Sequence, residues 1–131
     1  MTQKLTLTLL PETLAICRLP PEVPTPAWAS GGDFFSITRT RDELSVVAPE
    51  GRVPAAVRRE GGFRALKVEG PIPFSAVGIL ASLLDPLARA GISVLALSTF
   101  DTDYLLVKQS DLDRVVAELR ATGHRVNDQP A

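Results

Sequence analysis

Apolar and polar residues alternate in short runs along the first half of the chain, which predicts strands. Leucine alternates with threonine over residues 4–9, as in a strand with one buried face. Similar runs bounded by turn-forming residues predict three more strands, at residues 13–19, 34–39 and 44–48. The proline-rich residues 20–26 exclude sheet pairing, because proline has no N–H to donate. Two short helices are expected, at residues 27–30 and 53–59.

Apolar residues in parts of the second half of the chain recur with a longer, helical period. Apolar residues on one face predict a helix over residues 75–90, with Ser75 as its N-cap and Gly91 as its stop. A second apolar stripe predicts a helix that opens at Ser110 and ends at Gly123. Strands are expected around these helices, at residues 63–69, 92–97, 104–108 and 124–126.

The second half therefore has the order β-α-β-β-α-β, and the first half can be arranged in the same order. We expect an α+β fold of two ferredoxin-like units in tandem, each an antiparallel sheet with helices on one face. The expected boundaries are residues 1–61 for the N-terminal unit and 62–131 for the C-terminal unit. This expectation rests on the order of elements, because the two halves show no residue-level repeat.

Composition narrows the function classes. The 131 residues carry 14 Lys and Arg against 15 Asp and Glu, a net charge of −1, without the basic cluster that nucleic-acid binding requires. Cys17 is the single cysteine and lies in an apolar run, so we expect a buried thiol and no disulfide. His124 is the single histidine, which gives no support for a metal or catalytic site. We expect no cofactor.

The N-terminus lacks the pattern of a signal peptide, and no apolar run approaches the roughly 18 residues of a membrane span. The expectation is therefore a cytoplasmic protein without membrane contact.

Residues 91–107 hold the most candidate chemistry, as two apolar strands joined by a polar turn. The turn carries three hydroxyl side chains, two aromatic rings nearby and the carboxylates of Asp101 and Asp103. Both aspartates are typical of turns, and Asp103 is equally a candidate to accept hydrogen bonds from an ammonium group. Gly78, near the start of the preceding helix, either lets an anion approach the helix N–H groups or allows tight packing against the sheet.

These residues resemble an ACT domain. The resemblance rests on the element order, on Gly-Ile-Ser-Val at residues 91–94, on the segment 98–107, and on Val-Gly-Ile-Leu at residues 77–80. It extends over residues 63–126 and is diffuse over the first 60. More specifically, the chain is similar to small bacterial tandem-ACT proteins related to the ligand-binding half-domains of CASTOR-type arginine sensors.

The resemblance implies a regulatory module that binds a free amino acid at an interface between ACT units or subunits. Carried over onto this chain, the implied ligand-binding residues are Gly78, Ile79, Thr99, Phe100 and Asp103. Thr99 is as consistent with a sheet position as with a ligand contact, and Phe100 with core filling as with a pocket. In the arginine sensors an acidic residue near the helix start helps to hold the basic side chain. Residues 75–77 are Ser-Ala-Val here, so arginine specificity does not carry over.

Two function hypotheses follow, from different classes. The first is a non-catalytic sensor of a free amino acid that acts on an unidentified protein partner. The alternative is an interaction module that forms a homodimer through its ACT edge strands without a ligand. An enzyme is not expected, because the sequence offers no set of base, nucleophile and oxyanion donors.

Overall fold

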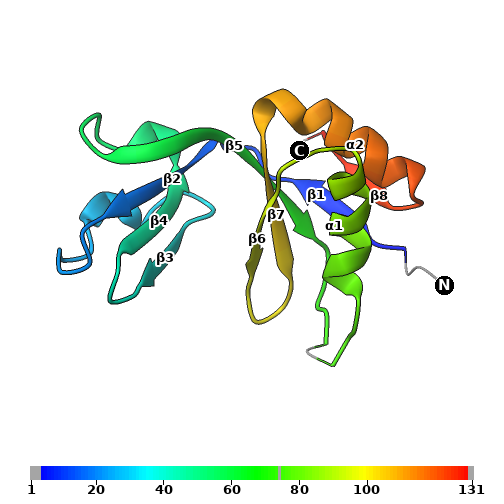
Figure 1. Cartoon of the computed structure of the whole chain (residues 1–131), viewed down its shortest axis with the longest axis horizontal. Coiled ribbons are helices and arrows are strands. Elements are labelled where there is room, and N and C mark those ends of the chain that lie inside the picture. Colours follow the sequence, from blue (N-terminus) through cyan, green and yellow to red (C-terminus); the bar gives the residue numbers. More distant parts are fainter. Residues whose placement is uncertain (1–3, 74, 130–131) are drawn as a thin grey trace. The chain divides into compact units, whose positions relative to one another are not determined.

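The computed structural model describes residues 4–73 and 75–129, and the chain divides into two compact units. Residues 12–63 form one, here called the N-terminal unit, and residues 1–11 with 64–131 form the C-terminal unit. Strand β5 (Arg58–Val68) contributes its first part to the N-terminal unit and the rest to the C-terminal unit (Figure 1). The fold class is α+β, as predicted.

The N-terminal unit is an antiparallel sheet in the order β3-β4-β2-β5. Its other strands and short 3-10 turns are β2 (Leu14–Leu19), η1 (Ala27–Ala29), β3 (Ser36–Arg39), β4 (Leu44–Pro49) and η2 (Glu50–Arg52). The expected turn of helix at residues 27–30 is the 3-10 turn η1. The helix expected over residues 53–59 is wrong, because the chain turns at residues 54–57 and Arg58 already begins β5. The rest of that range pairs with β2 as strand.

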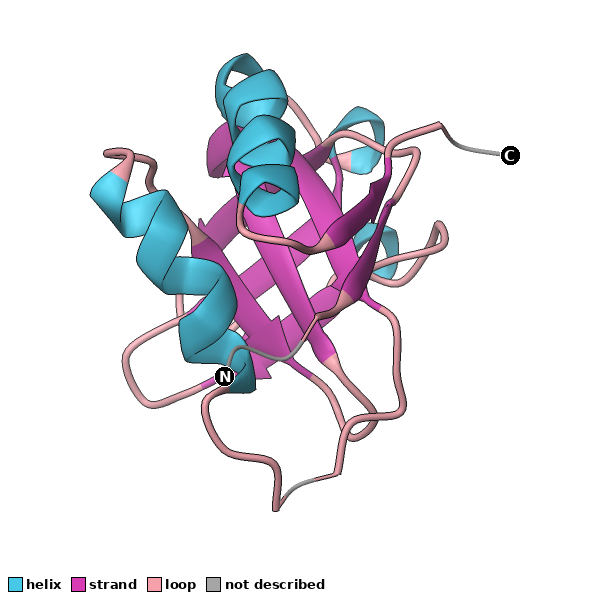
Figure 2. Cartoon of the chain, turned by 90° about the vertical axis from the view of Figure 1, so that its right-hand side faces the viewer, coloured by secondary structure: helices cyan, strands magenta, loops and turns pink. Residues whose placement is uncertain are grey.

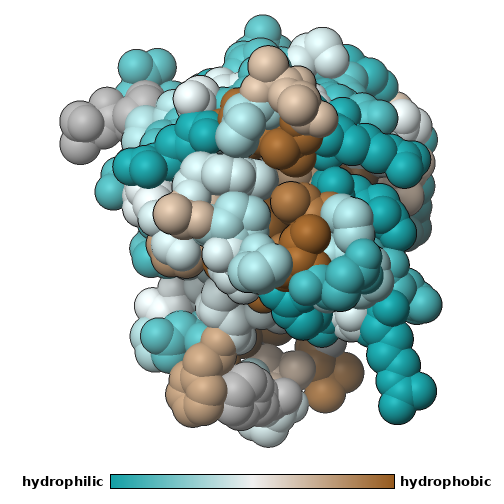
Figure 3. Space-filling model, turned by 90° about the vertical axis from the view of Figure 1, so that its left-hand side faces the viewer, coloured by the Kyte–Doolittle hydropathy of each residue, from teal (hydrophilic) through white to brown (hydrophobic). Residues whose placement is uncertain are grey.

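Small side chains fill the core of the N-terminal unit. The buried cluster consists of Ala15, Cys17, Ala29, Leu44, Val46, Ala48 and Val53, with Trp28 among the half-buried residues packed against it. Cys17 is buried as predicted, and this burial raises the pKa of its thiol, while the nearby charge of Arg59 lowers it by less. Hydrophilic residues cover most of the face seen in Figure 3, where the most hydrophobic ones gather in a narrow area.

The C-terminal unit is a mixed sheet in the order β6-β7-β5-β1-β8, covered on one face by two helices (Figure 2). Its elements are β1 (Thr6–Leu9), α1 (Ile79–Arg89), β6 (Leu95–Ser98), β7 (Asp103–Lys108), η3 (Gln109–Asp111), α2 (Leu112–Ala121) and β8 (Arg125–Asn127). Leucines of α1 and α2 bury against β1, β5 and β7 in one core. No helix among the described residues is long and apolar enough to cross a membrane.

Strand β1 belongs to the C-terminal unit, although residues 1–61 were expected to form the other one. It lies between β5, to which it is antiparallel, and β8, to which it is parallel. This sheet is therefore mixed, whereas an antiparallel sheet was expected. The reason is burial: Leu5, Leu7 and Leu9 all enter the core that α1 and α2 cover. The alternating pattern identifies a strand with one apolar face but does not say which core receives it.

The N-cap of helix α1 is Gly78 rather than Ser75, so the helix begins at Ile79, three residues later than predicted. Before it, the N–H of Ala76 donates to the carbonyl of Pro73 at 3.0 Å, which closes a turn that is not continued into the helix. Val77 lies within the range predicted as helix, but it precedes α1 and is 93% exposed.

Two hydrogen bonds fasten the turn between β6 and β7 to the chain that leaves β5. The buried hydroxyl of Thr102 donates to the carbonyl of Val68 at 2.5 Å, and the N–H of Ile72 donates to the carbonyl of Asp101 at 2.7 Å. Gly70 permits this approach, because a Cβ there would lie 3.0 Å from the Asp101 carbonyl oxygen. We call these contacts the turn anchor.

His124 ties the start of β1 to the end of α2. Its buried Nδ1 accepts the N–H of Leu5 at 3.1 Å, a bond that joins residues 119 positions apart. This geometry requires the proton of the neutral imidazole on Nε2. The single histidine therefore has a structural role in the described part of the chain.

The Leu5–His124 bond gives a stability prediction. His124→Leu places an apolar side chain at this buried site and removes the acceptor of the Leu5 N–H, so the free energy of unfolding should fall by about 1–3 kcal/mol. His124→Asn should lose less, because its amide oxygen occupies nearly the position of Nδ1. Urea unfolding followed by circular dichroism measures both. A His124→Leu variant as stable as His124→Asn would contradict this role.

The turn anchor gives a second stability prediction. Thr102→Val preserves shape and branching but leaves the Val68 carbonyl without its donor, so it should cost about 1–3 kcal/mol of unfolding free energy. Thr102→Ser keeps the hydroxyl and loses one methyl group, so we expect a smaller cost. The measurement is again urea unfolding, and a Thr102→Ser variant less stable than Thr102→Val would show that packing, not the hydrogen bond, matters at this position.

Candidate functional site

A cavity of about 350 Å³ opens in the C-terminal unit between the start of α1, the segment before it and the turn after β6. All five residues expected to bind ligand line it, namely Gly78, Ile79, Thr99, Phe100 and Asp103. The structure thus brings together residues that lie up to 25 positions apart in the sequence. Its volume lies at the lower end of the roughly 300–1,000 Å³ of small-molecule sites.

Gly78 supplies the sharp entry into α1. Its φ of 79° lies in the left-handed region, while a Cβ added there would meet nothing within 4 Å. The glycine is therefore required by backbone conformation and not by tight packing of helix against sheet.

The first turn of α1 presents backbone N–H groups without a capping side chain. The first helical hydrogen bond runs from the N–H of Ser82 to the carbonyl of Gly78, at 2.9 Å. Gly78, the N-cap, has no side chain with which to cap this end of α1, and the first turn contains no acidic residue. Gly78, Ile79, Leu80 and Ala81 all line the cavity. Unpaired N–H groups and the positive end of the helix dipole favour an anion at this position.

The turn after β6 uses most of its own polar groups. The N–H of Thr99 donates to the carbonyl of Thr102 at 2.8 Å. The Thr99 hydroxyl donates to the same carbonyl and accepts the Thr102 N–H. Thr99 therefore lines the cavity while its hydroxyl stabilises the turn. Thr99 follows the last residue of β6 and so lies in the turn, not in the sheet, while its contact with a ligand stays a prediction.

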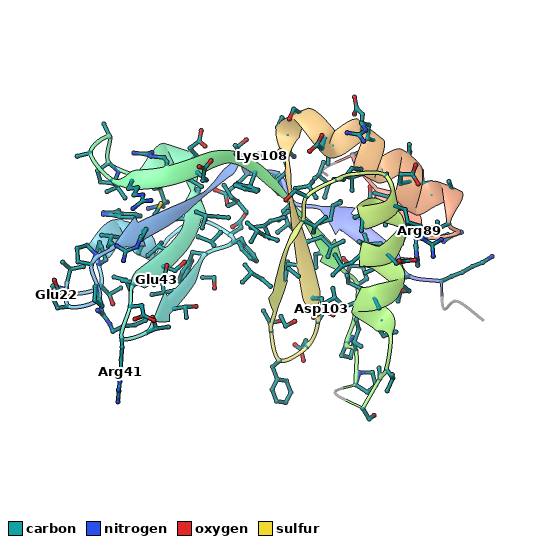
Figure 4. The ribbon with its side chains drawn as sticks, viewed as in Figure 1. Glu22, Arg41, Glu43, Arg89, Asp103 and Lys108 are labelled. Carbon is teal, nitrogen blue, oxygen red and sulfur yellow. The ribbon has the colours of Figure 1, made fainter. Side chains whose placement is uncertain are left out.

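Asp103 contributes the carboxylate at the cavity. It begins β7, on the side of the hairpin that lies toward α1 (Figure 4), and the hydroxyl of Ser98 donates to its Oδ1 at 2.6 Å. A carboxylate accepts several hydrogen bonds, so this one leaves capacity for a ligand. Asp101 is different: its side chain is exposed and does not line the cavity, and its carbonyl belongs to the turn anchor.

Phe100 lines the cavity at its rim and remains 79% exposed. It does not fill the core, which was one of the two expected roles. Sequence reasoning missed other lining residues, among them Ile72 and Pro73. The signal for them was weak, since they lie in a proline-rich break before the helix and share no periodicity with it.

The described residues contain no group of three or more His, Cys, Asp and Glu side chains placed to hold a metal ion. The arrangement can bind a small molecule that carries a carboxylate and an ammonium group. All its lining residues belong to the C-terminal unit. The expectation that a ligand lies at an interface between units or subunits stays a prediction.

Comparisons with known proteins show which families and structures this chain is similar to. A family model for the ACT domain matches residues 58–121, and a second model, for an N-terminal domain, matches residues 12–56. The protein "Cytosolic arginine sensor for mTORC1 subunit 1" of Bos taurus is 33% identical over 97 residues, which are 66% of this chain. The chain spans about 30% of the length of that relative.

Solved structures share the fold. A protein of Agrobacterium tumefaciens is 39% identical, with a TM-score of 0.94 over 99% of this chain and 97% of that one. The regulatory subunit of aspartate kinase from Thermus thermophilus has a TM-score of 0.60 at 10% identity, over 89% of this chain and 97% of that one. At such low identity the second likeness concerns the fold alone. Together, the matched family model and the arginine-sensor relative identify the chain as a member of the ACT-domain family, with its ACT domain at residues 58–121.

Proposed function

We propose that this protein is a non-catalytic sensor that binds a free amino acid in the cavity of its C-terminal unit. The observation that carries the proposal is the pairing of two opposite charges at one cavity. The uncapped first turn of α1 suits the α-carboxylate, and the Asp103 carboxylate suits the α-ammonium group. A zwitterion satisfies both, whereas a simple anion or cation satisfies one.

The relatives support the regulatory part of the proposal. One is named a cytosolic arginine sensor, and the matched family model describes an ACT domain. We infer by this likeness a cytoplasmic protein without catalytic activity, in which ligand binding shifts the population of states that a protein partner recognises.

We also infer that the N-terminal unit is a reduced ACT-like companion, which makes the chain a tandem. Its order is strand, 3-10 turn, strand, strand, 3-10 turn, strand, which follows the ferredoxin-like order with short turns in place of helices. The match of residues 12–56 to a model of an N-terminal domain supports the same inference.

A thermal-shift screen of the whole chain against the twenty amino acids tests the proposal. A ligand that binds the native state at 100 times its Kd stabilises it by about 2.7 kcal/mol, so at least one amino acid at millimolar concentration should raise Tm by several degrees. If none does, ligand sensing fails. Light scattering would then show whether the chain forms the homodimer that the alternative requires.

Asp103→Asn tests the site itself. The amide oxygen can still accept the Ser98 hydroxyl, but the charge that holds the ammonium group is lost, so the ligand-induced rise in Tm should largely vanish. Asp101→Asn is the matched control. It removes the same charge only two residues from Asp103, but the side chain of Asp101 does not line the cavity. Equal losses in both variants would place the ligand elsewhere.

A further inference from the structure

We infer that the cavity selects amino acids with an uncharged, apolar side chain and rejects basic and acidic ones. This inference rests on the proposed function and specifies its ligand class. It follows from the groups at the cavity that remain to contact the ligand's side chain once its α-carboxylate and α-ammonium groups are bound.

The charge inventory is short. Asp103 is the sole charged side chain among the described residues that line the cavity. Once it holds the α-ammonium group, no carboxylate remains for a guanidinium or a side-chain ammonium. An acidic side chain would find no lysine or arginine in the lining and would be repelled by Asp103. A charge desolvated without a partner lowers affinity.

The hydroxyl groups at the cavity are already bonded within the protein. The hydroxyl of Ser98 donates to Asp103, that of Thr99 to the carbonyl of Thr102, and that of Thr102 to the carbonyl of Val68. A hydroxyl has a single hydrogen to donate, so none of the three is left to donate to a polar ligand side chain without breaking a bond of the turn.

The rest of the lining is apolar. Ile72 and Leu80 are half-buried beside the core, and Pro73, Ala76 and Phe100 extend the same surface to the rim. An aliphatic or thioether side chain that covers this surface removes apolar area from water, which is the favourable term available here. The small volume of the cavity, about 350 Å³, suits leucine, isoleucine, valine or methionine.

Isothermal titration of the whole chain tests the ligand class. Leucine and methionine should bind at least about tenfold more tightly than arginine, lysine, aspartate and glutamate. Leucinamide, which lacks the carboxylate, and 4-methylpentanoate, which lacks the ammonium group, should each bind at least about tenfold more weakly than leucine. Arginine or aspartate binding as tightly as leucine would overturn the selectivity while leaving the amino-acid sensor intact. Absence of binding by every amino acid would overturn the proposed function.

A gain of specificity tests the charge argument directly. Ala76 lines the cavity, so Ala76→Asp adds a second carboxylate, which should tighten binding of arginine and lysine at least about fivefold while that of leucine weakens or stays constant. Val77→Asp is the control, because Val77 is 93% exposed and does not line the cavity. Equal effects of the two variants would contradict the inference, since they would reflect net charge instead of cavity lining.

Discussion

The candidate site depends on the turn anchor, the pair of hydrogen bonds that joins the β6–β7 turn to the chain leaving β5. Thr102 donates its hydroxyl to Val68, and Asp101 accepts the N–H of Ile72. The first bond holds the turn against the sheet and the second holds the segment that leads to α1. Both walls of the cavity are therefore positioned by hydrogen bonds to backbone carbonyls, one donated by the Thr102 hydroxyl and one by a backbone N–H. Substitutions of side chains at the rim should consequently alter which ligand binds without moving the walls.

Hydrogen bonding at the cavity divides into groups that build the site and groups that remain for a ligand. The hydroxyls of Ser98, Thr99 and Thr102 build it, whereas the first-turn N–H groups of α1 and the Asp103 carboxylate remain. In the proposed function, the groups that remain determine how the ligand is oriented in the cavity. In this proposal, two opposite charges hold the α-carboxylate and α-ammonium groups of the ligand, and its side chain contacts an apolar surface. Selectivity then depends mainly on which side chain tolerates that surface.

Local pattern predicted most elements but not their partners. The strands and both long helices of the second half follow from periodicity, and the burial of Cys17 follows from the apolar run in which it lies. The five residues at the cavity were instead implied by the resemblance to ACT domains. The location of β1 does not, because leucine–threonine alternation is the same whichever core receives it. The start of α1 was misplaced because Ser75 is a favourable cap by type, while the turn closed by Pro73 and the left-handed Gly78 decide the actual start. The helix at residues 53–59 was wrong because pairing with β2 outweighs the weak preference of a short segment.

The turn anchor was beyond sequence reasoning for a different reason. It joins residues more than 25 positions apart through backbone carbonyls, which every residue possesses, so no residue type marks them. The same anchor also bears on the proposed sensing function, because it joins the two walls of the cavity. A ligand held at once by the start of α1 and by Asp103 links the two walls that the anchor already joins. Ligand binding therefore favours the arrangement in which the anchor is formed. The shift in this equilibrium can be no larger than the difference in the ligand's affinity for the anchored and the looser arrangement. Regulation of this kind needs no large movement, because the partner has only to distinguish an anchored turn from a loosened one.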